Sequence, residues 1–200
     1  MDKKNKVINY NFYHWGPFLY KTTTTKKEIG LVKKLCSKKL EDYRKHLAGL
    51  IRHEYELDSK KIFPILFPYV ESYLKAYLEH YSNKPLGNNV KLVSAWVNYM
   101  TKIESNPIHT HDDDLSFVLF LHIPKDLREE HDKQIGNTKP GCINFLNSLD
   151  NRPQIIGQHT FFPEVGDLFI FPACLNHYVN SFQCEGERIS VSGNLEVTSG

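Results

Sequence analysis

The pattern of hydrophobic and polar positions divides the chain into an N-terminal helical part and a C-terminal β-rich part. The first 25 residues mix aromatic side chains with a run of threonines, which predicts one or two edge strands and then a turn. In 26–56, apolar residues recur at spacings of three to five with basic residues between them, which predicts an amphipathic helix or two short ones. A second helical region is expected over 58–81. Its prolines, Pro64 and Pro68, should confine the regular part to the residues after them.

The pattern changes after the turn-rich stretch 82–89. Eight short apolar or alternating segments follow between 90 and 197, with turns or loops between them and no long helical period. They are KLVSAWVNYM, NPIHTH, LSFVLFLHI, GCINFLN, HTFFP, DLFIFP, NHYVNSF and ERISVSGNLEV. This succession predicts a mainly β fold, a sandwich or jelly roll, with the N-terminal helices packed on one sheet. Two long polar insertions, 125–140 and 147–158, are predicted to be loops.

The length of 200 residues predicts a single domain, 1–200, in which 1–89 supplies a strand and supporting helices and 90–197 forms the jelly-roll core. Hydrophobic residues make up 40% and charged residues 24%, as in ordinary globular proteins. The formal charge of +2 gives no global field for nucleic acid.

Four scattered cysteines without a C-x-x-C pair argue against a disulfide framework or a cysteine zinc site, and favour a reducing compartment. The first residues contain no apolar segment of the kind found in signal peptides. No stretch approaches the roughly 18 apolar residues of a membrane span. We therefore expect a cytoplasmic protein without membrane contact.

Three side chains with metal-binding chemistry lie close together in NPIHTHDDDL. His109, His111 and Asp113 occupy every second position, and alternate residues of an extended chain share a face. Another histidine, His177, follows the strongly apolar DLFIFP strand. Two histidines and one carboxylate form the facial triad that holds non-haem Fe(II) and leaves positions open for substrate and oxygen.

A second set of polar side chains lies in ERISVSGN near the C-terminus. Arg188, Ser190 and Ser192 share one face of the predicted strand. A buried arginine beside a hydroxyl suits a carboxylate ligand, because the guanidinium fork can bind both carboxylate oxygens.

The order of these motifs resembles the 2-oxoglutarate and Fe(II)-dependent oxygenase superfamily, in particular its small prolyl-4-hydroxylase-like members of bacteria and large phages. The matching segments are NPIHTHDDDLSFVLFLHIP, FFPEVGDLFIFPACLNHYVNSF and GERISVSGNLEV, so the resemblance covers about 91–197. It implies a double-stranded β-helix with iron at one mouth, and Fe(II), 2-oxoglutarate and O2 as cofactor and cosubstrates. By resemblance His177 is the distal iron ligand, Arg188 binds the far carboxylate of 2-oxoglutarate, and Ser190 assists it.

Two alignments of the first half of the iron site compete. His111 with Asp113 supplies the usual H-x-D pair, and we favour it together with His177, because a carboxylate lowers the charge of the site and suits hard Fe(II). His109 with His111 matches the H-x-H of a subgroup and lies ten residues after Tyr99, a spacing close to that of prolyl-hydroxylase relatives. His111 belongs to both alignments.

Relatives often place a tyrosine hydroxyl near the cosubstrate on the strand after the first motif. Phe120 stands on that strand here, so the hydroxyl has to come from another residue. Tyr99 and Ser116 are the candidates.

The resemblance implies a dioxygenase that hydroxylates a C–H bond and releases succinate and CO2. A protein residue, a nucleobase or a small metabolite would fit as substrate, and the tyrosine-rich segment PYVESYLKAYLEHY allows a homodimer. If a phage encodes the chain, the host cytoplasm is the expected location. The alternatives are a cupin-like metalloenzyme that does not use 2-oxoglutarate, and a non-catalytic jelly-roll module for binding or for a phage particle.

Overall fold

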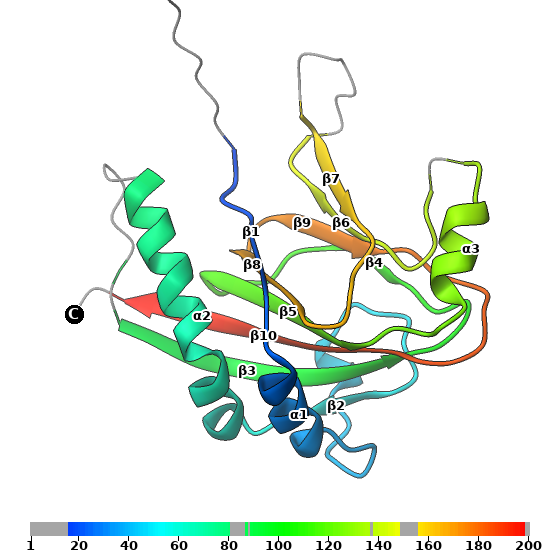
Figure 1. Ribbon diagram of the computed structural model, residues 1–200. Helices are drawn as coiled ribbons and strands as arrows, with labels where there is room; N and C mark the ends of the chain where they lie inside the picture. Colours follow the sequence, from blue (N-terminus) through cyan, green and yellow to red (C-terminus); the bar gives the residue numbers. More distant parts are fainter. Residues whose placement is uncertain (1–15, 81–86, 88, 137, 149–155, 199–200) are drawn as a thin grey trace, which may run out of the picture.

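The alternating segments of the sequence form two antiparallel sheets that face each other (Figure 1). The computed structural model describes residues 16–80, 87, 89–136, 138–148 and 156–198. The larger sheet has the order β1-β8-β5-β10-β3-β2 and the smaller sheet the order β4-β9-β6-β7. The larger sheet consists of β1 (Tyr20–Thr23), β2 (Glu54–Glu56), β3 (Asn89–Met100), β5 (Leu115–His122), β8 (Asp167–Pro172) and β10 (Arg188–Thr198). The smaller sheet consists of β4 (Asn106–His109), β6 (Ile143–Leu146), β7 (Gln158–Phe161) and β9 (Asn176–Val179).

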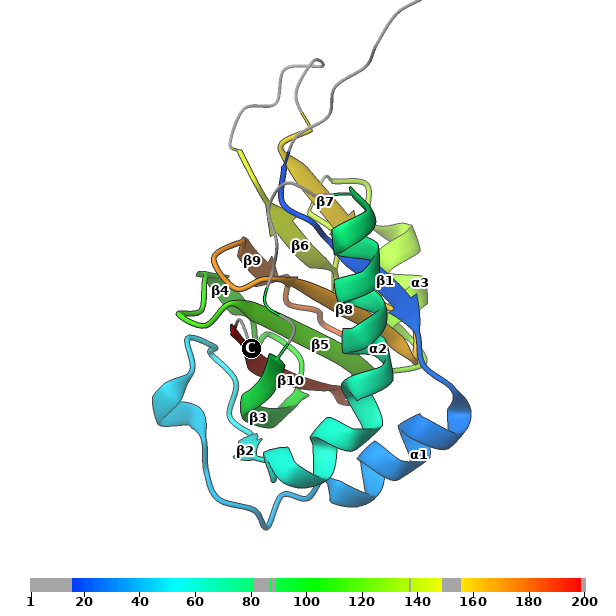
Figure 2. The ribbon, with the colours of Figure 1, turned by 90° about the vertical axis from the view of Figure 1, so that its left-hand side faces the viewer.

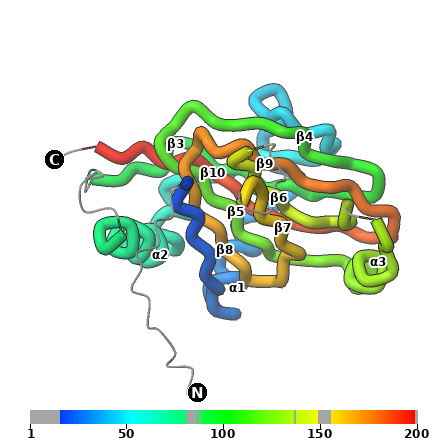
Figure 3. The backbone as a smooth tube through the Cα atoms, turned by 90° about the horizontal axis from the view of Figure 1, so that it is seen from above, coloured from blue at the N-terminus to red at the C-terminus, as the bar shows by residue number. Residues whose placement is uncertain are grey.

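Two helices, α1 (Lys26–Leu35) and α2 (Ser59–His80), lie on the face of the larger sheet that points away from the smaller one (Figure 2). A short helix, α3 (Leu127–Lys133), and a single 3-10 turn, η1 (Arg44–His46), complete the fold. Seen from above, the smaller sheet lies over the larger one (Figure 3). This arrangement confirms the predicted jelly-roll architecture with helices packed on one sheet. None of the helices in the described residues is both long and apolar enough to cross a membrane.

Alternation of side chains along the strands creates two separate hydrophobic cores. In β5, Leu119 and Leu121 face the helices, whereas Val118 and Phe120 face the smaller sheet. The outer core comprises Ile29, Val32, Leu57, Ile62, Leu66, Val70, Tyr73, Leu92, Ala95, Val97, Tyr99, Leu115, Phe117, Leu119, Leu121, Leu168, Ile170, Val191 and Leu195. The inner core comprises Ile51, Met100, Val118, Phe120, Leu127, Ile143, Phe145, Phe169, Phe171, Leu175, Val179 and Phe182. Each fully buried large side chain contributes roughly 1.5–3 kcal/mol, so both faces of the larger sheet are strongly stabilised.

The helix predicted over 26–56 is shorter in the structure. Thr25 begins α1 with a capping box, in which its hydroxyl and the Glu28 carboxylate each accept from a backbone N–H of the other residue. The helix ends at Leu35, and the apolar spacing of five residues that follows no longer fits a helical turn. Segment 36–53 instead uses its backbone for tertiary contacts, such as the Tyr43 N–H donating to the Glu54 carbonyl at 3.0 Å.

The second predicted helix is longer than expected at its start, because α2 contains both prolines. Asp58 lies just before the helix, and its carboxylate accepts from the Lys60 N–H at 3.0 Å. A proline frees the carbonyl four residues before it. Pro64 and Pro68 are exposed, and so is Lys60, so the freed carbonyls of Lys60 and Pro64 lie on the solvent side.

All eight strands predicted between 90 and 197 are present. The predicted strand near the N-terminus is β1 at the edge of the larger sheet, while residues 1–15 lie outside the described residues. Of the two predicted loops, 125–140 contains α3, and 149–155 of the other lies outside the described residues.

Candidate active site

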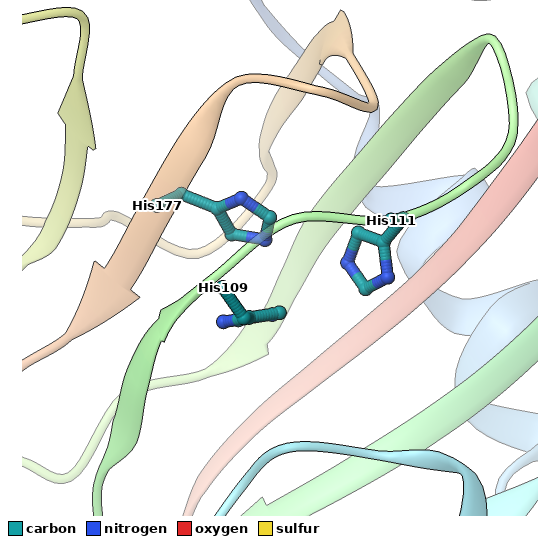
Figure 4. A group of neighbouring side chains, drawn as sticks. All are labelled: His109, His111 and His177. Atoms are coloured by element: carbon teal, nitrogen blue, oxygen red, sulfur yellow. The ribbon is translucent and has the colours of Figure 1, made fainter.

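Three histidines meet where the smaller sheet faces the larger one (Figure 4). His109 ends β4 and is the register partner of His177 on β9, so strand pairing brings their rings to a centroid distance of 4.2 Å. The His111 ring lies 5.0 Å from that of His109 and 5.2 Å from that of His177. One ligand nitrogen from each ring lies within 4.8 Å of the others. The three side chains can therefore hold one metal ion between them.

Hydrogen bonds to the backbone orient two of these imidazoles. The Nδ1 atom of His109 lies 2.7 Å from the Pro107 carbonyl oxygen, and that of His177 lies 2.9 Å from the Leu175 carbonyl oxygen. A carbonyl can only accept, so Nδ1 carries the hydrogen in both rings and Nε2 keeps its lone pair. This pattern is typical of metal-binding histidines.

Burial keeps the histidines neutral. It lowers the pKa of His177 to about 3, with further lowering by the neighbouring His109 and His111. Burial and then His109 lower the pKa of His111 to about 4, and burial lowers the pKa of His109. Neutral imidazoles are the form that binds iron, zinc, copper or nickel, so the donor set fits Fe(II) and leaves positions open for other ligands.

Asp113, the carboxylate that we favoured from the sequence, is not part of this group. The chain bends at 112–114 after His111, so alternation along an extended strand no longer applies. The Asp113 side chain is half-buried. Burial and the charges of Asp112, Asp114 and Glu196 raise its pKa, against the opposing effect of Asn194 on β10. The structure thus brings together the H-x-H pair and His177.

Arg188 is a buried cation at the start of β10. It is 2% exposed, and its Nη1 donates to the Gly141 carbonyl at 3.0 Å, while its Nε has no partner among the described residues. Its guanidinium lies 5.3 Å from the centre of the Phe120 ring, and burial lowers its pKa to about 10. Burying a charge without a counter-charge is costly, so this arrangement is typical of a site for an anionic ligand.

The histidines and Arg188 line the same cavity, which is open to solvent on one side and has a volume of about 40 Å³. Ser190 and Ser192 also line the cavity, and the Asn98 amide nitrogen lies 3.4 Å from each of their hydroxyl oxygens. The predicted carboxylate-binding residues Arg188 and Ser190 therefore share one cavity with the histidine group.

The two candidate hydroxyl groups from the sequence do not line this cavity. Tyr99 points to the opposite face of β3 and packs in the outer core, because its neighbour Asn98 faces the cavity and side chains alternate along a strand. Ser116 is buried beside β10, where its hydroxyl donates to the Asn194 amide oxygen at 2.8 Å. Neither Tyr99 nor Ser116 therefore faces the cavity that contains Arg188 and the histidines.

Three polar residues of the cavity were missed in the sequence. Glu54, Asn98 and Asn106 line it together with Arg188, and each of the four has a buried nitrogen or oxygen atom without a hydrogen-bond partner. In the described part of the chain, these four are the complete set of such atoms. The alternation in HEYEL around Glu54 was a strand signal, but it was included in the predicted helix.

Comparison with known proteins adds independent information. Residues 94–194 match the family described as "Putative 2OG-Fe(II) oxygenase". No curated protein matches the chain.

Several solved structures have a similar fold. A 2OG-Fe(II) oxygenase family oxidoreductase from Burkholderia pseudomallei has a TM-score of 0.55 and 15% identity, with 90% of this chain and 84% of that one covered. A prolyl-4-hydroxylase from Pseudomonas putida has a TM-score of 0.56 and 14% identity, with 89% and 91% covered. HygX from Streptomyces hygroscopicus, solved with nickel and 2-oxoglutarate, has a TM-score of 0.51 and 12% identity, with 90% and 82% covered. At these identities the likeness concerns the fold alone.

Proposed function

Because the chain belongs to the 2OG-Fe(II) oxygenase family, whose cofactor and cosubstrate are Fe(II) and 2-oxoglutarate, we propose that it hydroxylates a C–H bond of its substrate in the cavity between the two sheets. His109, His111 and His177 hold the metal in this proposal. The chemistry supplied by bound Fe(II) and 2-oxoglutarate is the reduction of O2, coupled to oxidative decarboxylation that yields succinate and CO2.

The three histidines bind the metal through neutral imidazoles. The carbonyls of Pro107 and Leu175 hold the hydrogen of His109 and His177 on Nδ1, which directs Nε2 at the metal. His111 is held through its backbone, since its N–H donates to the Ala173 carbonyl at 2.9 Å. Asp113 takes no part as a ligand in this proposal.

Arg188 and Ser190 bind the far carboxylate of 2-oxoglutarate. The Arg188 Nε atom is buried without a partner, so a carboxylate would supply both the missing acceptor and the missing negative charge. Ser190 lies on the same face of β10, two residues away, and its hydroxyl adds a second donor.

Apolar side chains of the cavity keep water away from the reacting groups. Phe171, Val179 and Trp96 line it, and the Trp96 ring lies 5.7 Å from that of His111. A dry wall strengthens electrostatic interactions inside the site and protects reactive species from side reactions.

The observation that carries the proposal is the shared cavity, which is lined by three neutral histidines and by a buried arginine whose Nε has no hydrogen-bond partner among the described residues. A metal binder without 2-oxoglutarate has no use for the arginine. A jelly-roll binding module has no use for the histidine group.

Anaerobic titration tests this proposal. We expect 2-oxoglutarate to produce a saturable visible charge-transfer band when added to the chain with Fe(II). The band should be lost in His177→Ala and should require far more 2-oxoglutarate in Arg188→Ala, whereas Arg128→Ala, at an arginine outside the cavity, should behave as wild type. Absence of both the band and calorimetric 2-oxoglutarate binding under iron loading would reject the proposal and favour the cupin-like or binding-module alternative.

A further inference from the structure

A group of buried oxygen atoms in the cavity is not used by the proposed metal and cosubstrate sites. Glu54 Oε2, Asn98 Oδ1 and Asn106 Oδ1 are buried and have no hydrogen-bond partner among the residues that the structure describes. Glu54 is 1% exposed and Asn98 is 5% exposed. Buried polar atoms are nearly always paired in native proteins, so three unpaired atoms around one cavity point to a ligand.

The strand register places two of these residues side by side. Glu54 on β2 is the register partner of Asn98 on β3, and Asn106 begins β4 in the smaller sheet. The Asn98 amide nitrogen faces the hydroxyls of Ser190 and Ser192, so its amide oxygen is the atom left over.

Gly49 keeps the space beside two of the three residues open. A methyl group at this position would lie 3.2 Å from Glu54 Oε1 and 3.2 Å from Asn106 Oδ1. Both side chains therefore lie next to Gly49, and the space beside their oxygen atoms stays open because Gly49 has no side chain.

The chemistry of the unpaired atoms specifies what the ligand must offer. The two amide oxygens are acceptors, and so is the carboxyl oxygen of Glu54 when it is ionised, so the ligand has to donate and a positive charge is favoured. A primary ammonium has three N–H donors on one atom, as many as there are unpaired oxygen atoms on the residues that line the cavity. The buried guanidinium of Arg188 lines the same cavity and suits an anion. The cavity therefore has one part that favours an anionic group and another that favours a cationic group.

We propose that Glu54, Asn98 and Asn106 form a subsite for a primary ammonium group of the substrate, so that the enzyme oxidises an amine-bearing molecule. This inference rests on the proposed function for the word substrate, but the binding of the amine does not depend on the metal.

The charge balance of Glu54 agrees with this assignment. Burial and the neighbouring Glu104 raise its pKa to about 7, Arg44 acts in the opposite direction, and Asp42 adds to the rise. An ammonium bound at the carboxyl group would favour the ionised form and complete the missing charge pair.

Calorimetric titration of the full chain with n-butylammonium tests the subsite. Two probes with the same alkyl chain serve as comparisons. n-Butylguanidinium is also a cation but has five N–H donors in a planar fork, and n-butanol has a neutral hydroxyl group. The titrations are run on the chain alone and on the chain loaded with Zn(II) and 2-oxoglutarate. We expect butylammonium to bind best in both forms, because the acceptor atoms are not metal ligands.

Two variants and one control variant locate the binding. Glu54→Gln should weaken butylammonium binding about tenfold or more, since the negative charge that strengthens the hydrogen bond from the ammonium is lost. Glu56→Gln makes the same charge change on the same strand at an exposed position and should bind as wild type. Gly49→Ala removes no polar group but fills the space beside Glu54 and Asn106, so it should also weaken binding. Thermal unfolding of each variant verifies that it is folded.

The outcomes separate this inference from the proposed function. Equal butylammonium affinity in wild type and Glu54→Gln, or equal or tighter binding of butanol or butylguanidinium by wild type, would overturn the ammonium subsite. Zn(II) and 2-oxoglutarate would still bind in that case if the proposed function is correct. If instead the chain binds butylammonium through Glu54 but takes up neither Zn(II) nor 2-oxoglutarate, the subsite stands and the proposed function fails.

Discussion

His109 and His177 face each other across β4 and β9, with ring centroids 4.2 Å apart. Pairing of two strands of the smaller sheet, rather than a loop, therefore sets the distance between two of the proposed metal ligands. His111 completes the group from the chain just after β4, where its backbone N–H is bound to Ala173.

Replacing His109 tests which pair of residues supplies the metal ligands. His109→Ala should weaken Co(II) binding by about 100-fold or more, because even residues that merely orient ligands are worth about 10- to 100-fold. Asp113→Ala should leave Co(II) affinity unchanged. Anaerobic absorption titration measures both, with His159→Ala at an exposed position as the control. The reverse ranking of His109→Ala and Asp113→Ala would restore the H-x-D alignment.

Arg188→Met should separate stability from cosubstrate binding. Replacing a buried unpaired charge by an apolar side chain of similar length should raise the stability of the cofactor-free chain by about 1 kcal/mol. The same change should abolish the rise in melting temperature that 2-oxoglutarate gives the metal-loaded wild type. Thermal unfolding with and without 2-oxoglutarate measures both effects. A melting temperature of Arg188→Met that rises with 2-oxoglutarate as in wild type would contradict the role of Arg188.

Glu54→Gln should change the pH dependence of stability in the cofactor-free chain. The pKa of this carboxyl is raised from 4.5 to about 7 in the folded state, mainly by burial. Between these values the folded chain holds a proton that the unfolded chain has released, so the free energy of unfolding falls as the pH rises. The variant lacks this loss. Urea unfolding gives the free energy of unfolding of the variant minus that of wild type. We expect this difference to increase by about 1 to 3 kcal/mol from pH 5 to pH 8.

The exposed Glu56→Gln variant is the control for that measurement and should track wild type at both pH values. A constant difference between Glu54→Gln and wild type across this range would show that Glu54 titrates normally.

Gly193→Ala should destabilise the centre of the larger sheet. A methyl group there would lie 2.5 Å from the Ser94 carbonyl oxygen and 2.6 Å from the Phe117 ring. β3 and β5 flank β10 on both sides, so the strand has no room to shift. We expect a loss of about 1 to 3 kcal/mol in urea unfolding. Gly30→Ala, in α1 with open space around it, should cause no loss, and similar losses in both variants would contradict the steric account.

The sequence predicted most strands well because one face or both faces of them are buried. β5 and β8 are mainly apolar, since one side packs in the outer core and the other in the inner core. Segment 36–53 was predicted as helix because its apolar residues recur at nearly helical spacings. Residues such as Ile51 are apolar there because they reach the inner core from an irregular backbone.

Parts of the candidate site could not be derived from spacing alone. His109, His111 and Asp113 are equivalent in an extended chain, and the bend at 112–114 separates the last from the others. Tyr99 and Asn98 are neighbours, and the face of β3 that points to the cavity depends on pairing with β2 and β10. Glu54 lies on a strand of only three residues, and the alternation in HEYEL does not show which face of that strand points to the cavity.

Segment 36–53 gives the cavity a wall that is independent of the residues proposed to do chemistry. Leu47, Ala48 and Ile51 line the cavity from this segment, whereas the histidines and Arg188 come from β4, β9, β10 and the chain after β4. Evolution or a protein engineer can thus vary substrate selectivity here by exchanging one stretch of chain, while the reactive centre is inherited unchanged. The same scaffold can in this way serve a series of enzymes that share a reaction and differ in what they accept.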